Sequence, residues 1–220
     1  MDTVTVCAAE MTVYEAIRTR RDVRAEFTGE PIDEATLWRI LAAAHCAPSV
    51  GNSQPWDFVL VRNSATLRKF AAHVAEKRLE FARSLPAERT RTFEPIKIEG
   101  IEESATGIVV THDDSRGGPH VLGRATVPET GVYSTILAIQ NLWLAATAEQ
   151  VGVGWVSFYD AAFLAELIEL PAHMRPVAWL CIGPVTEFQR VPDLERFGWR
   201  DRRPLTDAVY RESYGERRTE

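Results

Sequence analysis

The feature that most constrains the fold is a strongly apolar segment from Thr135 to Gln150, closed by Gly152. Apolar residues occupy most sides of a helix built from it, which predicts burial at the centre of a domain rather than on a surface. Gln140 and Asn141 interrupt the segment, and no stretch of the chain reaches the roughly 18 apolar residues that a membrane span needs. We therefore expect a buried central helix and no membrane association.

Weaker patterns predict further elements on both sides of this helix. We expect helices over 12–19, from 33 to before Pro48, over 64–84 with Ser64 as its cap, and over 161–170 and 207–212, and strands over 58–61, 108–111, 153–158 and 177–182. Helices and strands mix without regular βαβ alternation, and we find no repeat or linker, so one α+β domain over residues 1–220 is expected. The 17 residues from 113 to 129 contain three glycines and no predicted element, which is typical of a binding loop or lid.

The charge and cysteine content exclude several classes of function. Lys and Arg number 25 against 31 Asp and Glu, a net charge of −6, so a broad nucleic-acid-binding face is not expected. Three cysteines without paired spacing and an N-terminus without a signal-peptide pattern predict a cytoplasmic protein. The five histidines lie in none of the common metal-binding motifs, so no metal site is expected.

Three segments, and a second cluster of arginines, carry residues suited to a small ligand. The arginines of 20–24 and a second group at 196–203 offer the paired donors that bind phosphate. The loop 48–56 presents a hydroxyl and two amides between prolines, and the glycines of 152–154 allow a backbone to approach a flat ring. Because the chain has neither a P-loop nor a Rossmann fingerprint, a ligand with a ring and a phosphate points to flavin mononucleotide, FMN.

These segments resemble the nitroreductase family from about Met11 to Tyr214. The matching motifs are an R-R-x-x-R segment at 20–24, a P-S-x-x-N-x-Q-P-W segment at 48–56, a G-x-G turn at 152–154 and a basic segment at 200–205. The resemblance implies a mixed sheet flanked by helices around the buried helix, in a homodimer with exchanged terminal segments and FMN at the interface. It implies that FMN is bound by a set of residues from all four motifs: Arg20, Arg21, Asp22, Val23, Arg24, Ser49, Asn52, Gln54, Gly154, Ser157, Arg200 and Arg202.

Asp22 departs from the common family pattern, which has a serine there. Together with Ser157 and the glycine-rich loop 115–124, it resembles the branch of 5,6-dimethylbenzimidazole synthases. That branch implies O2-dependent fragmentation of reduced FMN, supplied by a separate flavin reductase, to 5,6-dimethylbenzimidazole for the lower ligand of cobalamin. Asp22 is then a candidate general base beside the ribityl chain, and Ser157 a candidate catalytic contact at the ring. The plainer interpretations are an Asp22 that pairs with an arginine and a Ser157 satisfied by backbone.

Two other functions remain open on the residues alone. An NAD(P)H-dependent nitro- or quinone reductase would retain FMN as a cofactor and oxidise a pyridine nucleotide directly. A non-catalytic flavin-binding protein would bind FMN tightly and form no product.

Overall fold

The computed structural model describes residues 11–215, so Cys7 and most of the N-terminal segment considered above lie outside the described residues. Four strands form one sheet in the order β1-β2-β4-β3, with β1 at Trp56–Val61, β2 at Gly107–Asp113, β3 at Val151–Val156 and β4 at Met174–Pro184. All three strand pairs are antiparallel, and a parallel pairing occurs at the isolated bridge between Asp22 and Val153. The mixed character expected of the sheet is therefore confined to this bridge.

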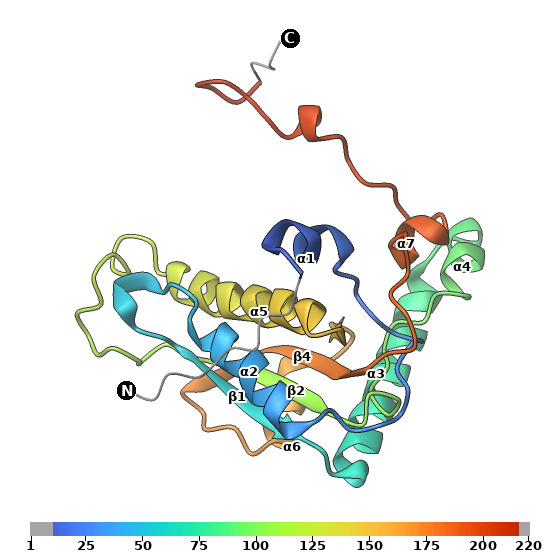
Figure 1. The fold of residues 1–220 in the computed structure, drawn as a ribbon, viewed down its shortest axis with the longest axis horizontal. Coiled ribbons are helices and arrows are strands. Elements are labelled where there is room, and N and C mark those ends of the chain that lie inside the picture. Colours follow the sequence, from blue (N-terminus) through green and yellow to red (C-terminus); the bar gives the residue numbers. More distant parts are fainter. Residues whose placement is uncertain (1–10, 216–220) are drawn as a thin grey trace.

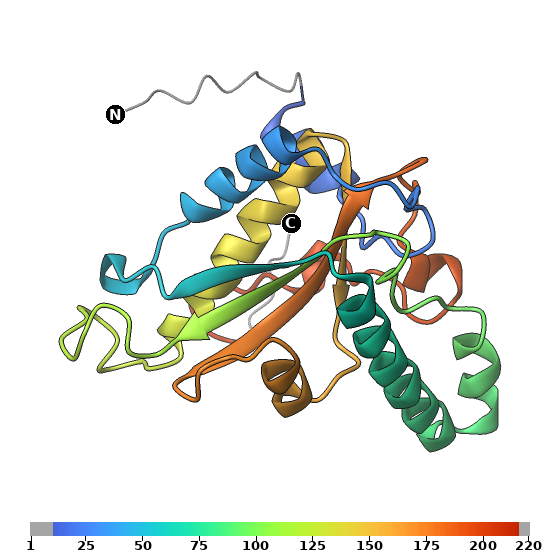
Figure 2. The ribbon, with the colours of Figure 1, turned by 90° about the horizontal axis from the view of Figure 1, so that it is seen from below.

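Helices cover both faces of the sheet (Figure 2), because successive strand residues point to opposite sides. On one face, α2 (Glu34–His45) and α5 (Thr130–Ala148) pack on Ile108 and Val110. On the other face, α3 (Ser64–Ser84), α4 (Ala87–Phe93) and α6 (Ala161–Leu167) enclose a second core around Val109 and Trp179. This arrangement is the expected α+β architecture.

The helix boundaries follow their caps. The Thr12 side chain accepts a hydrogen bond from the Glu15 N–H at the start of α1 (Val13–Thr19), and Asp33 caps α2. α3 has the expected bounds, 64–84, but Asn63 rather than Ser64 caps it, since the Asn63 side chain accepts from the first free N–H groups. Two short polar helices, α4 and α7 (Asp193–Arg196), carry no strong apolar periodicity and were not predicted.

The central helix α5 begins at Thr130, five residues before its expected start. Gly131 lies in this extra turn, where an added Cβ would stand 3.2 Å from the Cε1 atom of His112. The helix is not enclosed on all sides within one chain, because Tyr133, Ile136 and Leu137 are 56, 37 and 45% exposed. The prediction of full burial is therefore wrong for the single chain. These three residues form an exposed apolar row on α5.

The C-terminal arm extends away from the body (Figure 1). The predicted helix over 207–212 is absent, and a short 3-10 helix, η2, occupies Leu205–Asp207 instead. Leu205 and Tyr214 are 77 and 91% exposed, so the arm buries no apolar face against its own chain. A helix of this length is stabilised mainly by such packing, which explains why none forms here. No helix within residues 11–215 is long and apolar enough to cross a membrane.

Candidate functional site

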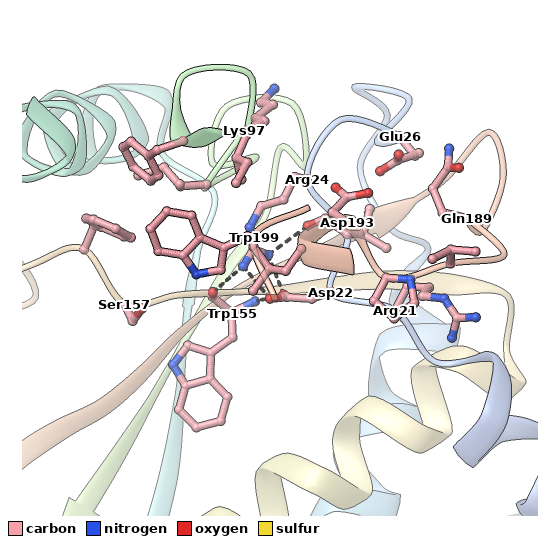
Figure 3. Close-up of a pocket in the computed structure, with 18 of the residues that line it drawn as sticks. Arg21, Asp22, Arg24, Glu26, Lys97, Trp155, Ser157, Gln189, Asp193 and Trp199 are labelled. Carbon is pink, nitrogen blue, oxygen red and sulfur yellow. Dashed lines mark hydrogen bonds and ion pairs between the residues drawn. The ribbon is translucent and has the colours of Figure 1, made fainter. Parts of the chain in front are cut away.

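A cavity of about 630 Å³ opens beside the end of the edge strand β3, and its volume is within the range that holds drug-sized ligands. The arginine segment 21–24, the end of β3, α3, α4 and the region around α7 line it. Figure 3 shows Asp22 near the middle of the drawn wall, with Arg21 on one side and Ser157 on the other. The cavity thus brings together two of the segments singled out in the sequence.

The arginine segment is fastened to β3 by backbone contacts. The Val23 N–H donates to the Val153 carbonyl oxygen at 3.0 Å, and Asp22 forms the parallel bridge to the same residue. An added Cβ at Gly154 would stand 2.1 Å from the Val23 carbonyl oxygen. The glycine expected to make room for a flat ring therefore makes room for the protein's own backbone.

Arg21 forms the cationic end of the cavity, and Arg20 precedes it in the chain without lining the cavity. The Arg20 guanidinium lies over the Trp143 ring, 4.6 Å from its centroid, and the Trp143 indole N–H donates to the Arg21 carbonyl at 3.0 Å. The Arg21 Nη atoms donate to the backbone carbonyls of Arg18, Arg20 and Arg190, but its buried Nε has no hydrogen-bond partner. Burial, followed by repulsion from Arg20 and Arg202, lowers the pKa of Arg21. A buried unpaired donor among repelling cations is suited to an anion.

Asp22 and Arg24 form a paired unit on the cavity wall. Both terminal nitrogens of Arg24 donate to the Asp22 carboxylate, the Nη2–Oδ2 distance being 2.5 Å. The Trp155 N–H donates to Asp22 Oδ1 at 2.8 Å, and the Trp155 carbonyl accepts from Arg24 at 2.8 Å. The Asp22 side chain is 47% exposed, whereas Arg24 is buried. Both residues line the cavity, and the carboxylate is the more open of the two.

Ser157 is exposed and follows the last residue of β3. The expected strand, 153–158, included Ser157, but β3 begins and ends two residues earlier, at Val151 and Val156. It follows a turn in which Gln150 has a positive φ of 59°. Beyond Ser157 the cavity wall becomes aromatic. The residues of this wall include Phe81, Phe93, Phe158 and Trp199.

Sequence reasoning missed this aromatic wall. Phe81 lies on α3, Phe93 on the unpredicted α4, and Trp199 follows the unpredicted α7. No spacing in the sequence connects these three positions, because they meet through tertiary packing alone. Their apolar rings suit a flat heterocycle at the end of the cavity away from Arg21.

The amide loop, residues 48–56, lies apart from this cavity in the same chain. The Val50 N–H donates to Ser134 Oγ near the start of α5, whereas Trp143 on the cavity wall is nine residues further along that helix. A helix rises 1.5 Å per residue, so the two regions are separated by about 13 Å along α5. Within one chain the structure therefore does not bring Ser49, Asn52 and Gln54 to the arginine segment.

The amide loop is nevertheless preshaped. Asn52 and Gln54 have positive φ angles of 53° and 46°, and the Gln54 side chain donates to the Asn52 side-chain oxygen at 3.0 Å. The Gln54 N–H also donates to Ser49 Oγ at 3.0 Å. Such strained non-glycine conformations are maintained where they position functional groups.

The loop 113–129, expected as a lid, packs beside the amide loop rather than over the cavity. An added Cβ at Gly51 would meet Val121 Cγ1 at 2.7 Å, which shows the close contact of the two loops. Arg116 donates to both carboxylate oxygens of Asp57 at 3.1 and 2.6 Å, and Arg124 donates to the Arg116 carbonyl at 3.0 Å. These contacts describe a loop that is anchored at several points and braces the amide loop.

The C-terminal candidates Arg200 and Arg202 are exposed at the base of the extended arm. Arg202 is near enough to Arg21 to affect its pKa. Arg200 makes a backbone contact to Leu194 and does not line the cavity described above. Within residues 11–215, no group of three or more His, Cys, Asp and Glu side chains could hold a metal ion.

The nitroreductase family profile matches residues 17–184. The chain belongs to the nitroreductase family. It is 46% identical over 190 residues to the 5,6-dimethylbenzimidazole synthase of Rhodospirillum rubrum, covering 84% of this chain and 87% of that protein.

Solved structures share the fold of this nitroreductase-family chain. A BluB-like flavoprotein from Clostridium difficile 630 has a TM-score of 0.69 at 18% identity, covering 92% of this chain and 100% of that one. An iodotyrosine deiodinase bound to FMN and 3-iodo-L-tyrosine has a TM-score of 0.70 at 18% identity, covering 92% and 99%. The expected nitroreductase-like fold is confirmed.

Proposed function

We propose that this protein is a 5,6-dimethylbenzimidazole synthase, an oxidoreductase that fragments reduced FMN with O2 into 5,6-dimethylbenzimidazole and erythrose 4-phosphate. The product serves as the lower ligand of cobalamin. The observation that carries the proposal is Asp22, a half-exposed carboxylate placed on the cavity wall inside the arginine segment. The identity to the synthase of Rhodospirillum rubrum supports the same activity.

The residues of the cavity fit FMN as the substrate. Arg21, with its unpaired buried Nε, and its neighbours Arg20 and Arg202 suit the phosphate. The aromatic wall beyond Ser157 suits the ring, so the ribityl chain would pass Asp22. Bound reduced FMN supplies the electrons that O2 accepts and the ring that becomes the product.

Asp22 would act on this substrate as a general base. Its carboxylate would accept the proton that the first ribityl carbon loses as O2 oxidises the reduced flavin. That carbon stays on the ring nitrogen and closes the imidazole ring of the product, and the bond between the first and second ribityl carbons breaks, which releases the four-carbon erythrose 4-phosphate. The exposed Ser157 hydroxyl would hydrogen-bond the edge of the ring. The apolar wall would exclude water from the reacting part of the ring.

The separation of the two half-sites supports a homodimer. The amide loop lies about 13 Å along α5 from the cavity wall, so Ser49, Asn52 and Gln54 would contact the FMN held by a second chain. The exposed apolar row on α5 and the extended C-terminal arm are surfaces that a second chain would cover. Arg200 and Arg202 would reach a phosphate as part of that arm.

The activity is tested by incubating the purified protein with FMN, NADH, O2 and a separate flavin reductase, followed by mass spectrometry. We expect 5,6-dimethylbenzimidazole to form in proportion to the FMN consumed. Intact FMN under these conditions would contradict the proposal. NADH or NADPH oxidation by the protein alone would then indicate a reductase, and its absence a flavin-binding protein.

The role of Asp22 is tested in the same assay. Asp22→Asn keeps the side-chain size and removes the base, so we expect product formation to fall by about 10²- to 10⁴-fold, the usual contribution of general base catalysis. Glu166→Gln, at an exposed carboxylate of α6 that does not line the cavity, is the control and should retain activity. Unchanged turnover by Asp22→Asn would remove Asp22 from the reaction.

A further inference from the structure

The Asp22 carboxylate is fixed from two directions. Arg24 approaches it with both terminal nitrogens, in the planar paired geometry that a guanidinium imposes on a carboxylate. The Trp155 N–H donates to Oδ1 from the adjacent strand, so Oδ1 accepts two hydrogen bonds and Oδ2 accepts one. An aspartate side chain held at three points has a defined position although it is half exposed.

Arg24 is itself held by the protein. Its Nη1 also donates to the Val23 carbonyl at 3.1 Å, and its Nη2 donates to the Trp155 carbonyl at 2.8 Å. The residue is 9% exposed, and its Nη1 atom would stand 2.7 Å from a Cβ added at Gly154. Both terminal nitrogens therefore have protein acceptors, as those of Arg21 also do. The two arginines differ in that Arg21 has in addition a buried Nε without a hydrogen-bond partner.

We propose that Arg24 is a positioning residue that holds the Asp22 carboxylate for proton abstraction and does not bind the phosphate. The inference rests on the proposed function, since it assigns Arg24 a role through Asp22. The R-R-x-x-R segment predicts phosphate binding for all of its arginines, whereas the contacts give Arg21 and Arg24 different roles. Arg21 carries the unpaired donor at the cationic end, and Arg24 completes the base.

Loss of the paired contact between Arg24 and Asp22 should lower the turnover rate. A misplacement of a reacting group by about 1 Å can cost on the order of 100-fold in rate. Arg24→Lys keeps the positive charge but replaces the paired fork by a single point contact. We expect kcat for 5,6-dimethylbenzimidazole formation to fall at least 10-fold, with KM for reduced FMN changed by less than about 3-fold.

A control is provided by Arg39, which also makes a paired contact to a carboxylate: its Nε and Nη2 donate to Glu149 outside the cavity, at 2.9 and 2.7 Å. Arg39→Lys should leave kcat unchanged. In the background of Asp22→Asn, Arg24→Lys should cause no further loss, because the group that it positions is already inactive. Additive losses in the double variant would overturn the positioning role.

A binding measurement tests the inference without relying on turnover. The affinities of oxidised FMN and riboflavin are measured by flavin fluorescence for the wild type, Arg24→Lys and Arg21→Met. We expect Arg24→Lys to bind both within about 3-fold of the wild type, whereas Arg21→Met loses affinity for FMN alone. An Arg24→Lys variant that loses FMN affinity at least 10-fold and keeps riboflavin affinity would identify Arg24 as a phosphate ligand and overturn the proposal.

The binding result keeps failure of the inference separate from failure of the synthase activity. A wild type that makes no product fails in the activity assay, while the FMN and riboflavin affinities still decide whether Arg24 binds phosphate. If Arg24→Lys does not fold, Asp22→Glu moves the carboxylate by one methylene and leaves the buried arginine in place. We expect its kcat to fall at least 10-fold with FMN affinity retained, and wild-type turnover by this variant would overturn the need for positioning.

Discussion

Gly154 and Val23 lie so close that a Cβ at position 154 would stand 2.1 Å from the Val23 carbonyl oxygen. The contact allows the arginine segment to run beside β3 and to form the bridge at Asp22 and Val153. The identity of a single strand residue therefore determines where a charged segment more than 130 positions away in the sequence can lie. The cavity depends on this close approach, because two of the segments that line it, the arginine segment and the end of β3, meet there.

Replacing Gly154 by alanine should move the arginine segment away from β3. The added methyl group must displace backbone rather than a flexible side chain, and such overpacking typically costs about 1–3 kcal/mol. We expect lower unfolding free energy in urea together with weaker FMN binding. Gly131→Ala is the control, since its Cβ would meet side-chain atoms, the His112 ring at 3.2 Å and Arg124 Cδ at 3.9 Å, and no backbone of another segment closer than these, and alanine favours the helix. Equal losses in both variants would contradict a special role for the Gly154 contact.

Arg21 should discriminate FMN from riboflavin. Its lowered pKa results from burial and from repulsion by Arg20 and Arg202, so a bound phosphate would relieve the repulsion and pair the free Nε. We expect Arg21→Met to weaken FMN binding at least 10-fold and to leave riboflavin binding nearly unchanged, as measured by calorimetry. Arg62→Met, on the exposed pair with Glu34, should change neither affinity.

The sequence predicted the main elements because their signals are local. The capping box at Thr12 and Glu15, the apolar face of α2 and the apolar segment of α5 each lie within a few helical turns. Boundaries were wrong where a tertiary contact decides them. Gly131 in the first turn of α5 leaves room for the His112 ring, and the sequence around residue 131 carries no sign of that contact.

The candidate site shows the same division. The arginine motif predicts one cationic segment, whereas the division of tasks that we propose between Arg21 and Arg24 rests on carbonyl acceptors from β3 and from residue 190. The aromatic wall depends on α4 and α7, whose short polar sequences resemble loops. Side chains that meet only through packing of distant segments leave no periodicity to read.

His112 should make the stability of the protein depend on pH. Its ring is fully buried, with Nδ1 2.8 Å from Thr135 Oγ1 and Nε2 2.9 Å from Asp114 Oδ1. Burial lowers its pKa, against an opposing effect of the Asp114 contact. Because the folded pKa lies below that of the unfolded chain, the unfolded state takes up the proton first as the pH falls.

Stability should therefore decrease as the pH falls below about 6.5, the ordinary pKa of histidine, and continue to decrease down to the folded pKa. The slope is measured by urea unfolding at several pH values between about 5 and 8, the range in which histidine titrates. His112→Gln should flatten the slope below pH ~6.5, while replacing the exposed His120 by glutamine should leave it unchanged. A slope that persists in His112→Gln would assign the dependence to other groups.

The exposed row on α5 should be the surface through which two chains assemble. Tyr133, Ile136 and Leu137 are partly open in a helix that is otherwise buried, and the adjoining α1 exposes Tyr14 to 73%. Leu137→Glu places a charge at the centre of this row, where burial without a partner is costly. We expect a dimer to become a monomer in analytical ultracentrifugation, with FMN affinity falling at the same time, since the amide loop of a second chain would no longer reach the cavity.

Leu79→Glu is the matched control, because Leu79 is 52% exposed on α3, on the opposite face of the sheet. A Leu137→Glu protein that stays dimeric and binds FMN normally would place the interface elsewhere; a monomer with normal FMN affinity would instead show that one chain completes the site.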